Sequence, residues 1–110
     1  MFGIENQQAI NVFVQQPPKN PLVVPTARYN SVTSSDVLVS WGAPDSGADY
    51  YILKYRLQGN SYTTLSPIIN TSISIPNLIN GTYDFQVISV RNNVQSEPVE
   101  IIGEVINAAA

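Results

Sequence analysis

Short runs that alternate apolar and polar residues, separated by clusters of turn-forming residues, recur from residue 25 onward. A two-residue period is typical of β-strands that bury one face. The runs occupy residues 36–41, 50–57, 61–65, 72–75, 83–87 and 99–106. No segment of useful length shows the helical period. The pattern therefore predicts a single all-β sandwich over residues 25–106, followed by a short tail at 107–110.

The first 24 residues have a different composition, rich in Gln, Asn and Pro. Prolines favour extended backbone and interrupt helices, so we expect an extended N-terminal arm or linker over residues 1–24. One short run in it places Ile10, Val12 and Val14 on one face. These three residues are candidate partner contacts, because such a run can add a strand to a neighbouring sheet. Alternatively, the run is the last strand of a preceding domain or a flexible tail.

The length and the net charge of the chain limit the kinds of function that it can have. The chain has 110 residues, which suits one domain, and a formal net charge of −3 with only five basic residues. Phosphate backbones require clustered Lys and Arg, so we expect no nucleic-acid partner. The absence of cysteine means that the core alone must hold the domain together. No apolar run approaches the roughly 18 residues of a membrane span, and the N-terminus lacks the features of a signal peptide.

The inventory of reactive side chains disfavours enzyme chemistry. The chain contains neither His nor Cys, which removes the usual nucleophile–base pairs and most transition-metal sites. Asp45 and Asp49 form the one close acidic pair in a loop. Their Asp- and Gly-rich context is typical of a turn, with a weak calcium contact as the alternative. We therefore predict a protein that is not an enzyme, with no catalytic, cofactor-binding or metal-binding residues and no cofactor.

Five motifs occur in a characteristic order along the sandwich segment. They are Pro25, the VLVSWGAP run that contains Trp41, the YYILKY run at 50–55, the L-x-x-G-T-Y run at 78–83 and the SEP run at 96–98. In this order and spacing they resemble a fibronectin type III domain over about residues 24–106. The resemblance implies a seven-stranded immunoglobulin-like β-sandwich, here carrying the N-terminal arm.

The L-x-x-G-T-Y run resembles the tyrosine corner of that family. The resemblance implies that Leu78 closes the hydrophobic layer and that Gly81 permits the turn. It also implies that the Tyr83 hydroxyl bonds to an upstream backbone group. Alternation after the corner predicts that Asp84 and Gln86 face water. The predicted structural core is Trp41, Tyr51, Tyr55, Leu78, Gly81, Tyr83 and Phe85.

Apolar residues in the outward phase are the second group of candidate partner contacts. If Tyr51 and Tyr83 point inward, the outward apolar residues are Tyr50, Ile52, Ile88 and Val90. The family's third and sixth strands are neighbours, so these four residues are expected to share one face. Such a patch is a contact surface for a partner, is covered by the N-terminal arm, or is a scatter of single exposed residues.

The corner also bears on function. It is compact and lacks a proline before Gly81, and in this it resembles modules of bacteriophage tail and virion proteins and of bacterial surface proteins. The last loop contains no Arg-Gly-Asp. We therefore predict a structural or interaction module of a bacteriophage virion, in the tail or as capsid decoration. The arm anchors the module, and the sandwich is a spacer or adhesive domain.

The predicted partners are proteins, either virion neighbours or further copies of the chain, together with a host surface glycan as a further candidate. A sugar-binding face requires exposed aromatic residues in a row, and the candidates for it are Tyr50 and Tyr62. The alternative function is an accessory spacer or binding module of a secreted bacterial enzyme or adhesin. The corresponding locations are the virion or, for the alternative, the extracellular space and the bacterial cell surface.

Overall fold

The computed structural model describes residues 14–28 and 34–107, and within these ranges every regular element is a β-strand. The strands are β2 (Lys19–Arg28), β3 (Ser34–Gly42), β4 (Tyr50–Leu57), β5 (Thr63–Ile68), β6 (Ser72–Ile79), β7 (Gly81–Arg91), β8 (Val94–Gln95) and β9 (Val99–Ile106). No helix long and apolar enough to cross a membrane occurs in these described ranges.

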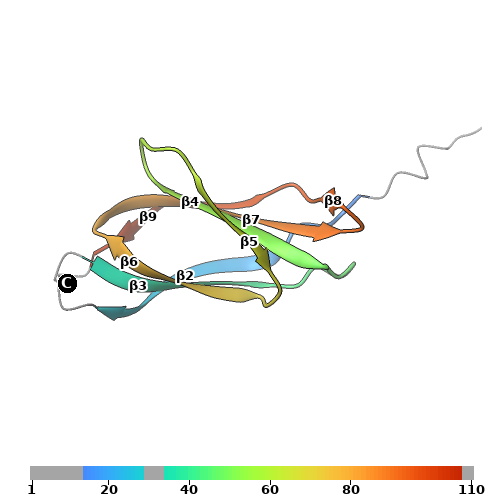
Figure 1. Cartoon of the computed structure of the whole chain (residues 1–110), viewed down its shortest axis with the longest axis horizontal. Coiled ribbons are helices and arrows are strands. Elements are labelled where there is room, and N and C mark those ends of the chain that lie inside the picture. The colour runs from blue at the N-terminus through green and yellow to red at the C-terminus, as the bar shows by residue number, and fades with distance from the viewer. Residues whose placement is uncertain (1–13, 29–33, 108–110) are drawn as a thin grey trace, which may run out of the picture.

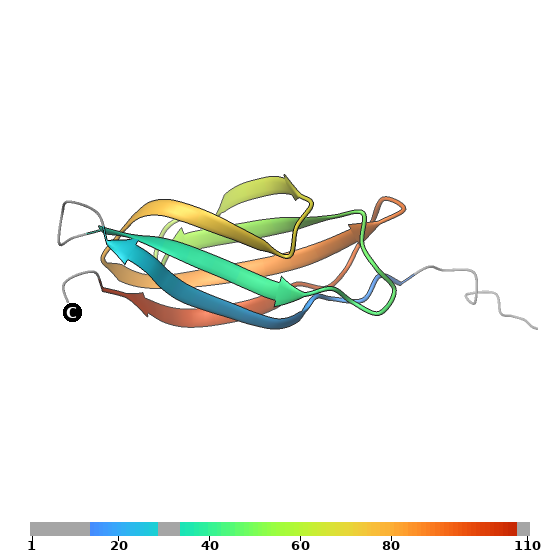
Figure 2. The ribbon, with the colours of Figure 1, turned by 90° about the horizontal axis from the view of Figure 1, so that it is seen from below.

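Two antiparallel sheets face each other (Figure 1, Figure 2). One sheet has the order β2-β3-β6, and the other has the order β5-β4-β7-β8, with β9 also paired to β7. Both β8 and β9 pair with β7, at Val90↔Gln95 and at Val87↔Val99 respectively. They are therefore two parts of one strand path, interrupted before β9 by Pro98, which has no N–H to give to the ladder. The predicted all-β sandwich of the immunoglobulin type is confirmed.

The core between the sheets comes from the alternation seen in the sequence. Val37 and Val39 of β3, Leu53 of β4 and Phe85 of β7 are each 0% exposed. Burying one such side chain fully contributes about 1.5–3 kcal/mol. Trp41, Tyr51, Leu78 and Tyr83 are also buried, whereas Tyr55 is half-buried and packs against the core from its margin. Trp41 meets Tyr51 edge-on, with the ring centroids 5.3 Å apart.

The tyrosine corner has the geometry that the resemblance implied. The Tyr83 hydroxyl donates a hydrogen bond of 2.8 Å to the carbonyl oxygen of Ile79. The Leu57 side chain covers Gly81: a Cβ at this position would lie 2.4 Å from Cδ1 of Leu57, so a larger residue here would require the end of that side chain to move. The corner thus joins the end of β6 to the start of β7 with its only buried hydroxyl paired.

The sandwich begins earlier than the sequence indicated. The alternating pattern places its start at residue 25, but β2 already begins at Lys19, and Leu22 and Val23 pair with Ser40 and Val39 of β3. Pro17 and Pro18 precede β2, and Pro21 lies where the register with β3 shifts between Lys19 and Leu22, an irregular part of an edge strand in which proline is tolerated. The part of the predicted arm from Lys19 onward is therefore a strand of the domain.

The outward apolar residues are not an exposed patch, which corrects our expectation. Ile52, Ile88 and Val90 are 8%, 6% and 1% exposed, and they form a second small core with the half-buried Tyr50. The register explains this burial, because Ile52 lies directly opposite Ile88 and Tyr50 directly opposite Val90 on the adjacent strands β4 and β7. Cross-strand neighbours at this spacing cover one another.

Candidate interaction surfaces

The first candidate surface lies at the N-terminal end of the sandwich, where residues 14–18, here called the strap, cross it. Gln15 is 2% exposed. Its Nε2 donates to the carbonyl oxygen of Gly47 at 2.6 Å and to Ser89 Oγ at 3.1 Å, and its Oε1 accepts from Ser46 Oγ at 3.3 Å. A buried amide is tolerated only when its polar atoms are paired in this way. The strap is therefore fixed to the β3–β4 loop and to β7.

Further polar contacts hold the same junction. Gln16 Oε1 accepts a hydrogen bond from the backbone N–H of Ser46 at 3.1 Å. Lys19 Nζ and Asp45 Oδ1 form an ion pair of 2.5 Å at the surface. Arg91 Nη1 donates to the carbonyl oxygen of Ser46 from the end of β7. The strap, the β3–β4 loop and β7 thus form one connected polar junction.

An open groove of about 350 Å³ runs beside the strap. Its lining residues are Val14, Gln15, Gln16, Pro17, Val94, Gln95 and Glu97. Val14 is 75% exposed, so the chain enters the domain through an apolar residue in contact with solvent. Of the three predicted arm contacts, only Val14 is described, since Ile10 and Val12 lie outside the described residues.

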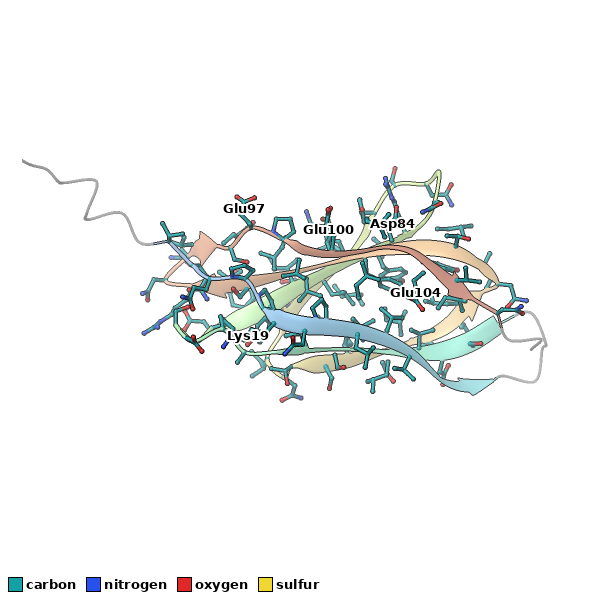
Figure 3. The ribbon with its side chains drawn as sticks, turned by 180° about the vertical axis from the view of Figure 1, so that it is seen from behind. Lys19, Asp84, Glu97, Glu100 and Glu104 are labelled. Carbon is teal, nitrogen blue, oxygen red and sulfur yellow. The ribbon has the colours of Figure 1, made fainter. Side chains whose placement is uncertain are left out.

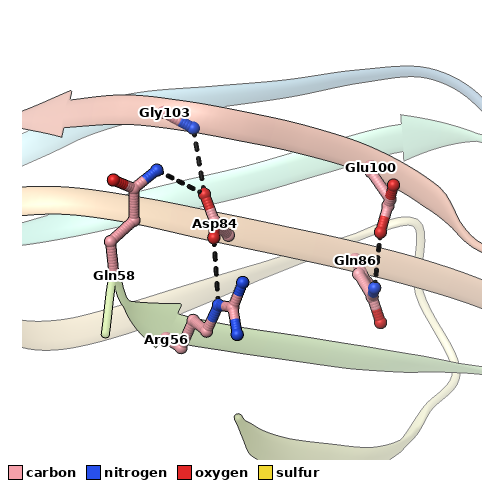
Figure 4. A network of polar contacts seen from close by, with 6 residues as sticks. All are labelled: Arg56, Gln58, Asp84, Gln86, Glu100 and Gly103. Atoms are coloured by element: carbon pink, nitrogen blue, oxygen red, sulfur yellow. Dashed lines mark hydrogen bonds and ion pairs between the residues drawn. The ribbon is translucent and has the colours of Figure 1, made fainter. Parts of the chain in front are cut away.

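The second candidate surface is the polar half of the outer face of the five-stranded sheet, around Asp84. We expected Asp84 to face water, but it is 2% exposed. Its Oδ2 accepts from Arg56 Nε at 2.9 Å, and its Oδ1 accepts from Gln58 Nε2 at 2.9 Å and from the Gly103 N–H at 3.0 Å (Figure 4). Gln86, also expected outside, is half-buried and donates to Glu100 Oε2 at 2.6 Å.

A β-bulge in β9 aims the Gly103 N–H at this carboxylate. Tyr83 pairs with Glu104 and Phe85 with Ile101, so two residues of β9 lie opposite Asp84. Gly103 has a φ of 77°, in the left-handed region that glycine adopts without strain. The glycine at this position was visible in the sequence, but its role depended on the register with β7.

The hydrogen bonds to Asp84 stabilise its charged form. The bond from Gln58 contributes most to lowering the pKa of Asp84 below its ordinary value, followed by the Gly103 N–H and by Arg56. Burial opposes this shift and raises the pKa, but the three donors outweigh it. Asp84 is therefore an ionised anchor at neutral pH, and it holds the Arg56 side chain in place.

Arg56 also lies over an aromatic ring. Its guanidinium carbon is 4.5 Å from the centroid of the Tyr62 ring, a cation–π contact between β4 and the β4–β5 loop. The Arg56 side chain keeps 36% of its surface exposed. This pair was not predictable from the sequence, because a Lys-x-Arg alternation in a strand indicates only an outward face.

The structure bears on the two interpretations of Asp45 and Asp49, a turn and a weak calcium contact. Asp45 pairs with Lys19, whereas Asp49 Oδ2 accepts from the backbone N–H of Asn92 at 3.0 Å. Each carboxylate thus has its own partner, and no group of three potential metal ligands occurs among residues 14–28 and 34–107. The Asp45–Asp49 segment has the turn structure that we favoured.

The two tyrosines considered for sugar stacking do not form a row. Tyr50 packs against the second small core, whereas Tyr62 packs under Arg56. Arg56 lies six residues along β4 from Tyr50, a separation of about 20 Å in a strand. An aromatic platform that uses both rings is therefore not present on this face.

Charged residues are divided between the two layers. Figure 3 shows Asp84, Glu97 and Glu100 along the outer side of the five-stranded sheet, while Lys19 lies on β2 in the other layer. Lys54 and Arg56 alternate with apolar residues on β4 and face the same outer side as Gln86 and Asp84, their cross-strand partners. This outer face therefore carries two cations, the carboxylates of Asp84 and Glu100, which already accept hydrogen bonds, and the exposed Glu97.

Two comparisons with known proteins are consistent with this architecture. The sequence profile of the fibronectin type III domain matches residues 17–102. A solved structure of a computationally redesigned β-sandwich protein is similar, with a TM-score of 0.69 and 21% identity. The alignment covers 86% of this chain and 97% of that one. At this identity the likeness shows the fold alone.

Proposed function

The chain belongs to the fibronectin type III family, whose domains mediate protein interactions and are generally non-catalytic, and from this premise we propose that it is a structural module of a bacteriophage virion. In this proposal the sandwich is a spacer or adhesive domain in the tail or on the capsid. The segment before Val14 anchors it to a neighbouring virion protein.

The single observation that carries the proposal is the way in which the chain enters and leaves the sandwich. The strap is fixed to Gly47 and Ser89 at one end, whereas Ile106 at the end of β9 pairs with Gly81 at the opposite end. Figure 1 shows the start of β2 near β8 and the end of β9 at the far side. A module with this geometry holds a protein bound at its N-terminal end apart from a protein bound at its C-terminal end, by the length of the sandwich.

Sequence features support the virion as the location. The compact corner at residues 80–83 resembles modules of phage tail and virion proteins, and the chain lacks both cysteine and histidine. A domain without disulfides is suited to particle assembly in a reducing cytoplasm. The low charged content of 12% leaves a surface on which Asn, Gln, Ser and Thr carry much of the polarity.

Particle fractionation tests the proposal. An antibody raised against the purified chain is used to probe density-gradient fractions from lysates of the organism that carries the gene. We expect the protein in the fractions that contain phage particles, at a fixed ratio to a major capsid or tail protein. Detection only in the culture medium or on the cell wall, as part of a longer polypeptide, would favour the accessory module of a secreted enzyme or adhesin.

A further inference from the structure

The exposed guanidinium of Arg56 is unusually well fixed for a surface side chain. Asp84 binds Nε on one edge, and the Tyr62 ring supports one face. Asp84 is itself held by Gln58 and by the Gly103 N–H, so the anchor does not depend on Arg56 alone. Long side chains on a surface usually lose considerable rotamer entropy on binding, and here much of that loss has already occurred on folding.

The Nη1 and Nη2 groups of this guanidinium remain available to bind a further group. Nε is the only guanidinium nitrogen of Arg56 with a hydrogen-bond partner among residues 14–28 and 34–107, and in Figure 4 the one dashed line to the guanidinium ends on Nε. Two parallel N–H donors of one guanidinium match the two oxygens of a carboxylate. We propose that Arg56 and Tyr62 form a recognition site for a single carboxylate side chain of a partner protein.

The charged residues around Arg56 favour a single carboxylate over a partner with many negative charges. Lys54 lies two residues away on the same face and adds positive potential, whereas Asp84 and Glu100 also lie on this side of the sheet. A nucleic acid or another polyanion brings further negative charges against these two carboxylates. A lone Asp or Glu brings only one, and it meets the guanidinium directly.

The Tyr62 ring determines which residues can lie next to the bound carboxylate in the partner protein. Tyr62 is half-buried, and Arg56 covers one face of its ring, so the remaining ring surface contacts residues adjacent to the bound acid. Arg and Tyr are among the residue types that most often dominate binding energy at protein interfaces. The partner segment that fits best has one acidic residue flanked by apolar or aromatic residues. This inference rests on the proposed function only in assuming that the module has a protein partner.

The test uses the purified full-length chain and two capped peptides, Gly-Phe-Glu-Phe-Gly and the matched Gly-Phe-Gln-Phe-Gly. Chemical shifts of the arginine Nε–H and tyrosine ring signals are followed by NMR during titration at low salt. We expect saturable shifts at Arg56 and Tyr62 with the Glu peptide, and binding about threefold to tenfold weaker with the Gln peptide. Equal binding of the two peptides, or shifts centred on the groove beside the strap, would overturn the proposal.

Three variants test whether binding needs the planar guanidinium of Arg56 or only its positive charge. Arg56→Lys keeps the charge but loses the planar guanidinium, and Tyr62→Leu removes the ring without touching Asp84; both are expected to weaken binding of the Glu peptide. Lys19→Gln is the matched control, because it removes a surface cation of the other layer, and its affinity should equal that of the wild type. Wild-type affinity in Arg56→Lys contradicts the proposal even if Tyr62→Leu fails to fold.

Inorganic phosphate is the third probe. If phosphate shifts the same signals at lower concentration than the Glu peptide does, the site is one for inorganic anions and the proposed protein carboxylate is wrong. Because every measurement is made on the isolated chain, failure here leaves the particle-fractionation result untouched. Absence of the protein from particles, conversely, leaves the binding result untouched.

Discussion

At the scale of single residues, the structure depends on polar side chains that the hydrophobic pattern does not distinguish. Tyr83 and Asp84 are neighbours on β7 and are 3% and 2% exposed. The tyrosine points between the sheets and the aspartate points to the outer face, and each has its hydrogen-bond partners on other segments. Removing the donor or the acceptor of such a buried hydrogen bond destabilises the fold by more than the net contribution of the bond, because the remaining polar group is then buried with neither a protein partner nor water.

The Tyr83 hydroxyl gives a direct test of the corner. Tyr83→Phe leaves the Ile79 carbonyl oxygen without this donor and is expected to lower the free energy of unfolding by about 1–3 kcal/mol. Urea denaturation measures this as a lower midpoint with an unchanged slope. Tyr55→Phe is the control, since Tyr55 is half-buried and its hydroxyl has no hydrogen-bond partner in the described part of the chain. Equal midpoints for wild type and Tyr83→Phe would contradict the role of the corner.

Asp84 gives a pH test. Its pKa is lower in the folded protein than in the unfolded chain, where an aspartate titrates at about 3.9. The folded state therefore gains stability from Asp84 above about pH 4, and this gain is lost as the pH falls through the lower, folded pKa. We expect Asp84→Asn to be less stable than the wild type at pH 7, with the difference shrinking as the pH falls below about 4.

Thermal unfolding at several pH values measures this difference. Glu97→Gln is the control, because it removes the same charge from an exposed position. It should show no comparable convergence with the wild type in acid. A gap between Asp84→Asn and the wild type that stays constant from pH 7 to pH 3 would show that the variant loses packing, and that the ionised carboxylate contributes nothing.

At the scale of elements, strands that bury one face were predictable from the sequence, whereas segments with mixed pattern were not. Val37 and Val39 alternate with outward residues on β3, and their burial follows from that period alone. The first half of β2 was not predictable, because Pro21 and the prolines just before the strand are equally typical of a linker. Proline is tolerated at a sheet edge, but no local pattern states that a strand is an edge strand.

The two candidate surfaces show the same limit. The buried Gln15 lies in a polar, proline-rich stretch that gives no local sign of burial, and its partners Gly47 and Ser89 are 32 and 74 residues away in sequence. Likewise, Arg56 meets Asp84 only through the pairing of β4 with β7. Residues whose role depends on long-range register could not be assigned from the sequence alone.

At the scale of the whole molecule, the strands at the sheet edges contain features that disfavour pairing with the strands of another sheet. The edge strands β2, β5 and β6 contain Pro21, Pro25, Pro67 and Pro76, and β9 is interrupted by the bulge at Gly103. Proline removes N–H donors from an exposed edge and a bulge disturbs its regular spacing, so both discourage edge-to-edge association. Contacts of this module with other proteins are therefore expected to use side chains on its faces and the segment before the strap.

Light scattering tests this view of assembly. A chain that begins at Val14 retains the strap and every described strand, and we expect it to keep the mass of a monomer at all concentrations measured. The full-length chain is the comparison: a defined oligomer formed only in the presence of residues 1–13 would assign self-assembly to that segment. A mass that rises with concentration in the shorter chain would instead show that a face associates. The exposed Leu22 and Val24 of β2, 56% and 40% accessible, would then be the first residues to replace with polar ones.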